Sequence, residues 1–147
     1  MIEQMRTIGL RLDRAGTFWQ AGAPVTHARL RQALLGWLDV REDGRDIVKL
    51  DATRYAYVEV ADAHLRARSA HWREARCFVL WDDEEERELA YGTLRQANDH
   101  ALYATVRKLR GRIAGPAYHA IAERIVEEAG SFALVAAGQH WPIANAA

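Results

Sequence analysis

Short stretches of alternating hydrophobic and polar residues dominate the chain. Between residues 7 and 13, Ile8, Leu10 and Leu12 fall on one face of an extended backbone. This alternation is typical of a half-buried strand. Similar alternation, or a short continuous apolar run, predicts further strands at 17–20, 46–50, 55–60, 64–72, 77–81, 88–94, 102–113, 131–136 and 141–143.

Two segments instead repeat apolar residues at the spacing of a helix. The first follows Thr26, a suitable N-cap, and ends near the turn at 43–44. The second begins at 115–116, where Pro116 suits a first helical turn, and runs to Gly130. The apolar stripes that predict these helices are Leu30, Leu34, Trp37 and Leu38 in the first, and Tyr118, Ile121, Ala122, Ile125 and Ala129 in the second.

Many short strands and two main helices predict an α+β fold. We expect a mostly antiparallel, strongly twisted sheet, either open or barrel-like, with the helices packed on it. The length of 147 residues suits one domain, so we predict a single domain over residues 1–147. A seam between two sub-lobes would fall near 73–76.

Charge and cysteine content narrow the range of partners. The chain has 20 Lys and Arg against 20 Asp and Glu, which gives no long-range attraction for nucleic acid or an anionic membrane. A net charge of zero also favours a homo-oligomer. Cys77 is the single cysteine, so no intramolecular disulfide can form, and no apolar run approaches membrane-spanning length. With no signal-peptide pattern at the N-terminus, these features predict a cytoplasmic protein.

The sequence lacks the local motifs of the common catalytic and nucleotide-binding families. His119 and Glu123 lie four residues apart on the second predicted helix, but this spacing is more typical of a solvated helix face than of a metal site. The row of Lys108, Arg110 and Arg112 is likewise more typical of a solvated strand face than of an anion site. We therefore assign no catalytic residue, no metal and no cofactor.

Three pairs of residues are candidates for binding a ligand. Tyr55 and Tyr57 share one face of a predicted strand and could form an aromatic wall. Asp62 and His64, two residues apart at the end of that strand, could place a carboxylate against an imidazole. The third pair, in the polar cluster before residue 102, is Asp99 and His100.

These candidates leave three functions open. The leading hypothesis is a non-catalytic binding module for a small molecule or a partner protein. The first alternative is a small hydrolase or lyase that uses a His/Asp pair, either Asp62 with His64 or Asp99 with His100. The second is an oligomeric structural protein assembled through sheet edges.

The order of features also resembles domain-of-unknown-function family 1285, a family of small bacterial proteins without an assigned activity. The residues that carry the resemblance are Leu10, Gly16, Trp19, Gly22, Pro24, Val25, Asp43, Gly44, Val60, Asp62 and Ala63, with Val106–Arg107, 115–118 and 138–143 towards the C-terminus. Ala61, His64 and Leu65 depart from the family pattern, and the match is poorest over residues 72–101. The resemblance implies a bacterial origin and an α+β fold, and it brings no catalytic residue.

Overall fold

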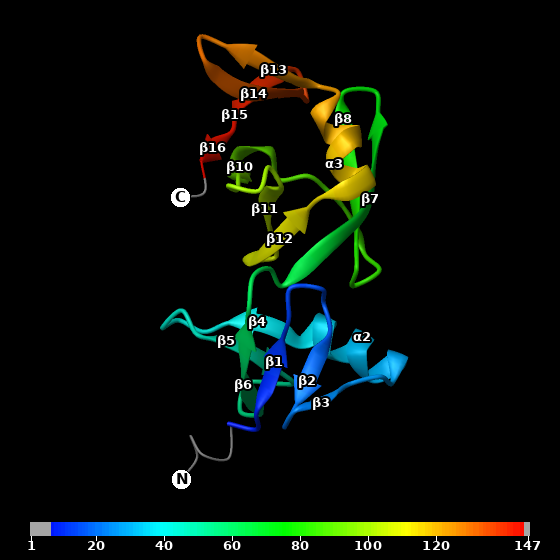
Figure 1. Cartoon of the computed structure of the whole chain (residues 1–147), viewed down its shortest axis with the longest axis vertical. Coiled ribbons are helices and arrows are strands. Elements are labelled where there is room, and N and C mark those ends of the chain that lie inside the picture. The colour runs from blue at the N-terminus through cyan, green and yellow to red at the C-terminus, as the bar shows by residue number, and fades with distance from the viewer. Residues whose placement is uncertain (1–6, 146–147) are drawn as a thin grey trace. The chain divides into compact units, whose positions relative to one another are not determined.

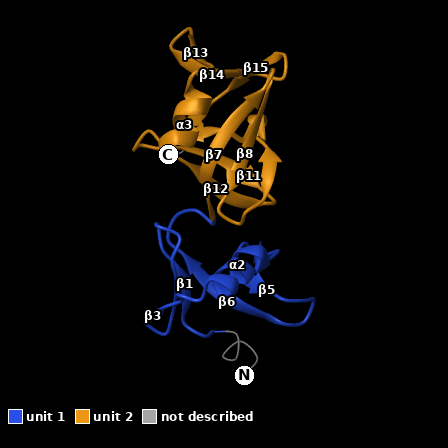
Figure 2. Ribbon diagram, turned by 90° about the vertical axis from the view of Figure 1, so that its right-hand side faces the viewer, with its two compact units in different colours: residues 1–64 blue, residues 65–147 orange. Residues whose placement is uncertain are grey.

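The computed structural model describes residues 7–145, and the chain divides into two compact units, residues 1–64 and 65–147 (Figure 2). Residues 73–76, where the sequence suggests a seam, form the tight connection between two paired strands inside the second unit. The division between the units falls instead after His64. That the chain is one domain stays a prediction.

Unit 1 is a sheet of short strands with one helix against it (Figure 1). The strands lie in the order β3-β2-β1-β6-β5-β4, and neighbours run antiparallel except β1 and β6, which are parallel. The elements are β1 (Leu10–Leu12), β2 (Phe18–Gln20), β3 (Ala23–Pro24), α2 (Ala28–Trp37), β4 (Leu38–Val40), β5 (Asp46–Lys49) and β6 (Tyr55–Val60).

Helix α2 is shorter than its sequence pattern predicts. Its N-cap is His27, whose Nδ1 accepts a hydrogen bond from the amide of Leu30 at 3.3 Å, so the assignment of Thr26 as cap is wrong. The helix ends at Trp37 because Leu38 already pairs with β5 as the first residue of β4. The buried side of the helix carries Leu34 and Leu35, whereas Leu30 is 44% exposed.

Unit 2 contains a larger sheet and a separate three-stranded sheet. The larger sheet has the order β16-β10-β11-β12-β7-β8-β9, with parallel pairing of β12 to β7 and of β10 to β16. The strands of the smaller sheet lie in the order β13-β14-β15. The elements are β7 (Leu65–Arg73), β8 (Arg76–Trp81), β9 (Glu86–Glu88), η1 (Tyr91–Thr93), β10 (Arg95–Gln96), β11 (Leu102–Val106), β12 (Leu109–Ile113), α3 (Gly115–Ala122), β13 (Ile125–Glu128), β14 (Ser131–Ala136), β15 (Gln139–Pro142) and β16 (Ala144–Asn145).

Helix α3 lies against β7 and carries the predicted proline in its first turn. It ends at Ala122, so the prediction that it continues to Gly130 is wrong. Ile125 pairs with Leu134 of β14 in an antiparallel ladder instead. A second difference concerns residues 102–113, which form two strands joined at Arg107 and Lys108, both with positive φ, rather than one bent strand.

The α+β class and the mostly antiparallel pairing are confirmed. Within residues 7–145 none of the sheets closes into a barrel, since each has two end strands. No helix in this part of the chain is long and apolar enough to cross a membrane.

Candidate functional site

A groove of about 470 Å³ lies on unit 1 over the strands β1, β5 and β6. Tyr57 and Glu59 of β6 contribute to its lining, and Arg45 and Asp46 contribute from the start of β5. The two strands lie side by side, because β5 pairs antiparallel with β6, with Ile47 opposite Tyr57. The groove lining therefore includes a phenol, a guanidinium and two carboxylates.

Tyr55 and Tyr57, the pair predicted to form an aromatic wall, pack against each other and against arginines. The rings of Tyr55 and Tyr57 meet edge to face, with centroids 5.8 Å apart. The Arg45 guanidinium lies 3.5 Å from the centroid of the Tyr57 ring, and that of Arg41 lies 5.2 Å from the Tyr55 centroid. Arg41 also donates a hydrogen bond to the Tyr57 hydroxyl. Cation–π contacts of this kind hold both guanidinium groups beside the groove.

His64 lies behind this groove. Its side chain is fully buried, and Nε2 is 2.7 Å from Oδ1 of Asp46. The carboxylate that contacts the imidazole thus comes from β5, 18 residues earlier in the chain, and not from the predicted two-residue spacing to Asp62. His64 orients a carboxylate of the groove lining and is itself shielded from solvent.

Asp62 is half-buried in the segment that follows β6, outside the groove lining. Tyr55 does not line the groove; its ring contacts that of Tyr57, which does. Of the candidates in unit 1, the structure therefore places Tyr57 in the groove itself and His64 one contact behind it.

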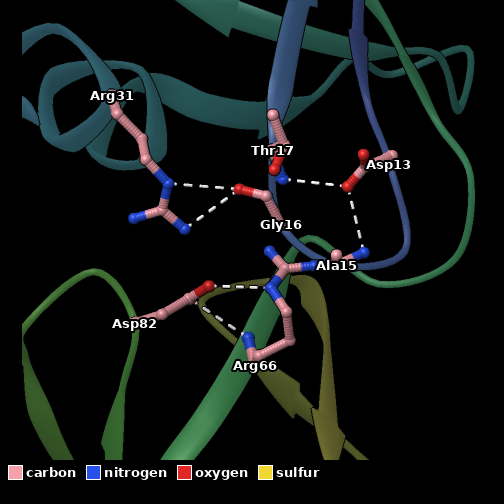
Figure 3. A network of polar contacts seen from close by, with 7 residues as sticks. All are labelled: Asp13, Ala15, Gly16, Thr17, Arg31, Arg66 and Asp82. Carbon is pink, nitrogen blue, oxygen red and sulfur yellow. Dashed lines mark hydrogen bonds and ion pairs between the residues drawn. The ribbon is translucent and has the colours of Figure 1, made fainter. Parts of the chain in front are cut away.

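The connection between β1 and β2 is held by a network around one carboxylate (Figure 3). Asp13 accepts hydrogen bonds from the amides of Ala15 and Thr17 at 3.0 and 2.9 Å and from the indole N–H of Trp19 at 2.9 Å. The Trp19 contact, followed by the backbone contacts, lowers the pKa of Asp13 below its ordinary value. Arg31 of α2 donates two hydrogen bonds to the carbonyl of Gly16, which ties the helix to this turn.

The third predicted pair, Asp99 and His100, belongs to unit 2, in the turn between β10 and β11. Asp99 forms an ion pair with Arg112 at 2.8 Å, and this contact lowers the pKa of the carboxyl below its ordinary value. Arg112 also donates to the Tyr103 hydroxyl at 2.8 Å. His100 is exposed and has a φ of +70°, as suits a tight turn. These contacts brace the turn between β10 and β11, and a ligand-binding role for Asp99 and His100 stays a prediction.

The acidic loop after β8 is largely neutralised by arginines of its own unit. Asp82 and Asp83 are buried, at 6% and 8% exposure. Arg66 donates its backbone amide and its Nε to Asp82 at 3.0 and 2.8 Å (Figure 3), and Arg87 pairs with Asp83 at 2.7 Å. The carboxylates therefore hold β7, β8 and β9 together and offer little charge to a ligand.

Cys77 is fully buried, and burial raises the pKa of its thiol to about 11. Its backbone amide donates to the Tyr91 hydroxyl at 3.0 Å, and that hydroxyl donates to Glu88 at 2.7 Å. Burial raises the pKa of Tyr91 to about 12. A thiol held in its neutral form is a poor nucleophile, which agrees with the interpretation of Cys77 as a core residue.

Sequence reasoning missed most of the groove lining. Glu59 shares the face of Tyr57 in the alternating pattern, so that signal was available. Arg45 and Asp46 offered only a charged pair after a turn, and the pairing of β5 with β6 was needed to place them. Within residues 7–145, no cluster of three or more His, Cys, Asp or Glu is placed to hold a metal ion.

Comparison with known proteins identifies relatives in fold. No protein-family model matches the sequence, and no curated protein does. A DUF1285 family protein from Silicibacter pomeroyi is similar in structure, with a TM-score of 0.78, 19% identity and coverage of 95% of this chain and 81% of that chain. A DUF1285 family protein from Shewanella baltica has a TM-score of 0.65 and 14% identity, over 78% of this chain and 91% of its own. The predicted resemblance to this family is thus confirmed at the level of the fold, and it carries no activity with it.

Proposed function

We propose that the chain is a non-catalytic binding module of a bacterial, cytoplasmic protein, and that the groove of unit 1 holds a small charged molecule. The observation that carries this proposal is the lining itself. It combines Arg45, Asp46 and Glu59 with the ring of Tyr57 in about 470 Å³. This volume lies in the range of ordinary small-molecule sites, roughly 300–1,000 Å³.

The lining favours a ligand with both a negative and a positive group. A guanidinium binds a carboxylate through charge-assisted hydrogen bonds, and a carboxylate such as that of Glu59 binds an amine in the same way. Both kinds of group line this one groove, at Arg45 and at Glu59. Zwitterions of amino-acid size fit this pattern better than a purely anionic or purely cationic molecule.

The enzyme alternative has less support. A general base must reach the proton that it removes, within hydrogen-bond distance or through one water molecule. His64 is fully buried and directs Nε2 at Asp46, and Asp99 is held in an ion pair by Arg112. In each predicted His/Asp pair, one residue therefore already contacts another side chain of its own unit: His64 contacts Asp46, and Asp99 contacts Arg112.

A ligand screen tests the proposal. We would expose the unmodified protein to amino acids, betaines, organic acids and simple amines, detect binding by saturation-transfer NMR, and measure affinities by calorimetry. We expect zwitterions to bind, and Glu59→Gln to weaken them about tenfold, which corresponds to roughly 1.4 kcal/mol. Tyr57→Ala should weaken them further by removing the wall against which Arg45 packs.

Glu42→Gln is the matched control, since Glu42 is exposed and lies outside the groove lining. It makes the same change of charge and should leave the affinity unaltered. Binding of zwitterions that neither Glu59→Gln nor Tyr57→Ala alters would place the site elsewhere. Absence of binding by every class would overturn the proposal.

The same samples test the two alternative functions. Conversion of a bound molecule, followed by NMR over hours and lost in His100→Ala, would favour the hydrolase or lyase. A defined oligomer in size exclusion, with no small-molecule binding, would favour a partner-binding or structural role.

A further inference from the structure

Unit 2 contains a second hollow, and its lining includes no Lys, Arg, Asp, Glu or His. It is a cavity of about 230 Å³ between α3, the hairpin of β13 and β14, and the strands β10 and β11. Its lining includes two hydrogen-bonding side chains, Gln96 and Tyr118. The remaining lining is entirely apolar: Leu102, Ala122, Ile125, Phe132 and Ile143.

The cavity is assembled from segments distant in the sequence. Leu102 is buried at its base, and the amide of Ile143 donates to the carbonyl of Phe132 at 2.9 Å, which holds two of its walls together. The Phe132 side chain lines the hollow and is 46% exposed. A molecule seated in the cavity would bury part of this ring.

We propose that this cavity is a binding site for a small, neutral, apolar molecule of one-ring size. Five of the seven lining side chains are apolar, which favours an uncharged ring, and a cavity of roughly 150 Å³ already accepts benzene. At about 230 Å³ the site has room for a substituted ring. Gln96 and Tyr118 offer hydrogen-bonding partners for a single polar group, such as a phenol.

The proposal is independent of the function proposed for unit 1, because the two sites share no residue. Failure of either leaves the other standing. A charged ligand suits the groove and is disfavoured here, because the cavity lining offers an ion no side chain of opposite charge.

Methyl NMR of the full chain with labelled isoleucine, leucine and alanine tests the site directly. The probe is p-cresol, with benzoate as a charged ligand of similar size. We expect p-cresol to shift the methyl signals of Ile125, Ile143 and Leu102 in a saturable way, and benzoate to leave them unchanged. No saturable shift up to the solubility limit of p-cresol would overturn the proposal.

A filling variant sharpens the test. Ala122→Leu places three extra carbon atoms in the cavity and should weaken p-cresol about tenfold or more. Ala114→Leu is the matched control, because Ala114 is exposed and precedes α3 outside the lining. Equal affinity in Ala122→Leu and wild type would overturn the site.

A truncation covers the case in which Ala122→Leu fails to fold. Phe132→Ala removes an exposed ring, so we expect the fold to survive and p-cresol to bind more weakly. Concentration-dependent shifts of the same methyl groups without added ligand would show that a second copy of the chain covers the cavity, and would overturn the small-molecule proposal.

Discussion

The hollows of the two units differ in what surrounds them. The groove of unit 1 is lined by ionisable groups of both signs. One of them, Asp46, contacts the buried imidazole of His64. The cavity of unit 2 is lined almost wholly by aliphatic and aromatic side chains. In unit 2 the acidic residues Asp82 and Asp83 pair with arginines of the same sheet. The two hollows therefore differ in charge: Arg45, Asp46 and Glu59 line the groove, whereas no Lys, Arg, Asp, Glu or His lines the cavity.

The largest expected effect tests the polar support in unit 1. His64→Ala removes a fully buried ring and the partner of Asp46, and should lower the free energy of unfolding by about 3 kcal/mol. Chemical denaturation followed by tryptophan fluorescence measures it. Asp46→Asn, which keeps the size and a hydrogen-bonding oxygen, should cost less. A loss below about 1 kcal/mol for His64→Ala would mean that the imidazole is dispensable.

The second prediction tests close packing in unit 2. An added Cβ on Gly111 would lie 2.5 Å from the Trp81 ring, so Gly111→Ala should cost about 1–3 kcal/mol through overpacking. Gly36 is the control: it lies inside α2 with no atom within 4 Å of an added Cβ. Gly36→Ala should therefore stabilise by about 0.5–1 kcal/mol. The same sign for both variants would contradict the packing argument.

Hydrogen exchange on the same two variants also addresses the domain organisation. Faster exchange confined to residues 65–147 in Gly111→Ala would make the units separate folding units. Faster exchange across both would support the single domain predicted from the sequence.

A third prediction concerns a buried polar contact in unit 2. Tyr91→Phe removes the hydroxyl that accepts from the amide of Cys77 but keeps the ring that stacks on Trp141 at 5.4 Å. The orphaned amide should cost about 1–2 kcal/mol. Thermal unfolding measures the loss. If the variant is as stable as wild type, the contact contributes nothing to the core.

The smallest effect depends on pH and belongs to unit 1. Asp13→Asn removes a carboxylate whose pKa is lowered in the fold, and should cost about 1 kcal/mol at neutral pH. Because the pKa is lowered, the stabilisation is present above the unfolded-state value of 3.8 and disappears as the pH falls through the folded-state value. Unfolding curves of both proteins between pH 7 and 2 should converge on the acidic side. A difference that does not change with pH would assign the effect to shape rather than charge.

Local sequence patterns suffice to place several strands but not the end of helix α3. The strands at 10–12, 46–49, 55–60 and 77–81 lie where alternation or an apolar run predicts them. The pattern failed at the end of α3, because Ile125 lies at helical spacing from Ile121 yet pairs with Leu134 in a ladder. Helical and strand periods overlap over such short distances, and only the neighbouring strand decides between them.

Only the part of the candidate site that lies on β6 was predictable from the sequence. Tyr57 and Glu59 share a face by alternation, which needs no knowledge of the fold. The partner of His64 could not be read in this way, because Asp46 reaches it across 18 residues through strand pairing.

The sequence by itself determined the α+β class, the faces of most strands and the burial of Cys77, since each depends on residues within a few positions. Only the tertiary structure decided which polar side chains meet: Asp46 with His64, Asp82 with Arg66, and Asp99 with Arg112. It also decided where hollows remain between the elements. The physical reason is that alternation and helical spacing are local, whereas ion pairs and cavities arise from strand order and register, which join distant parts of the chain.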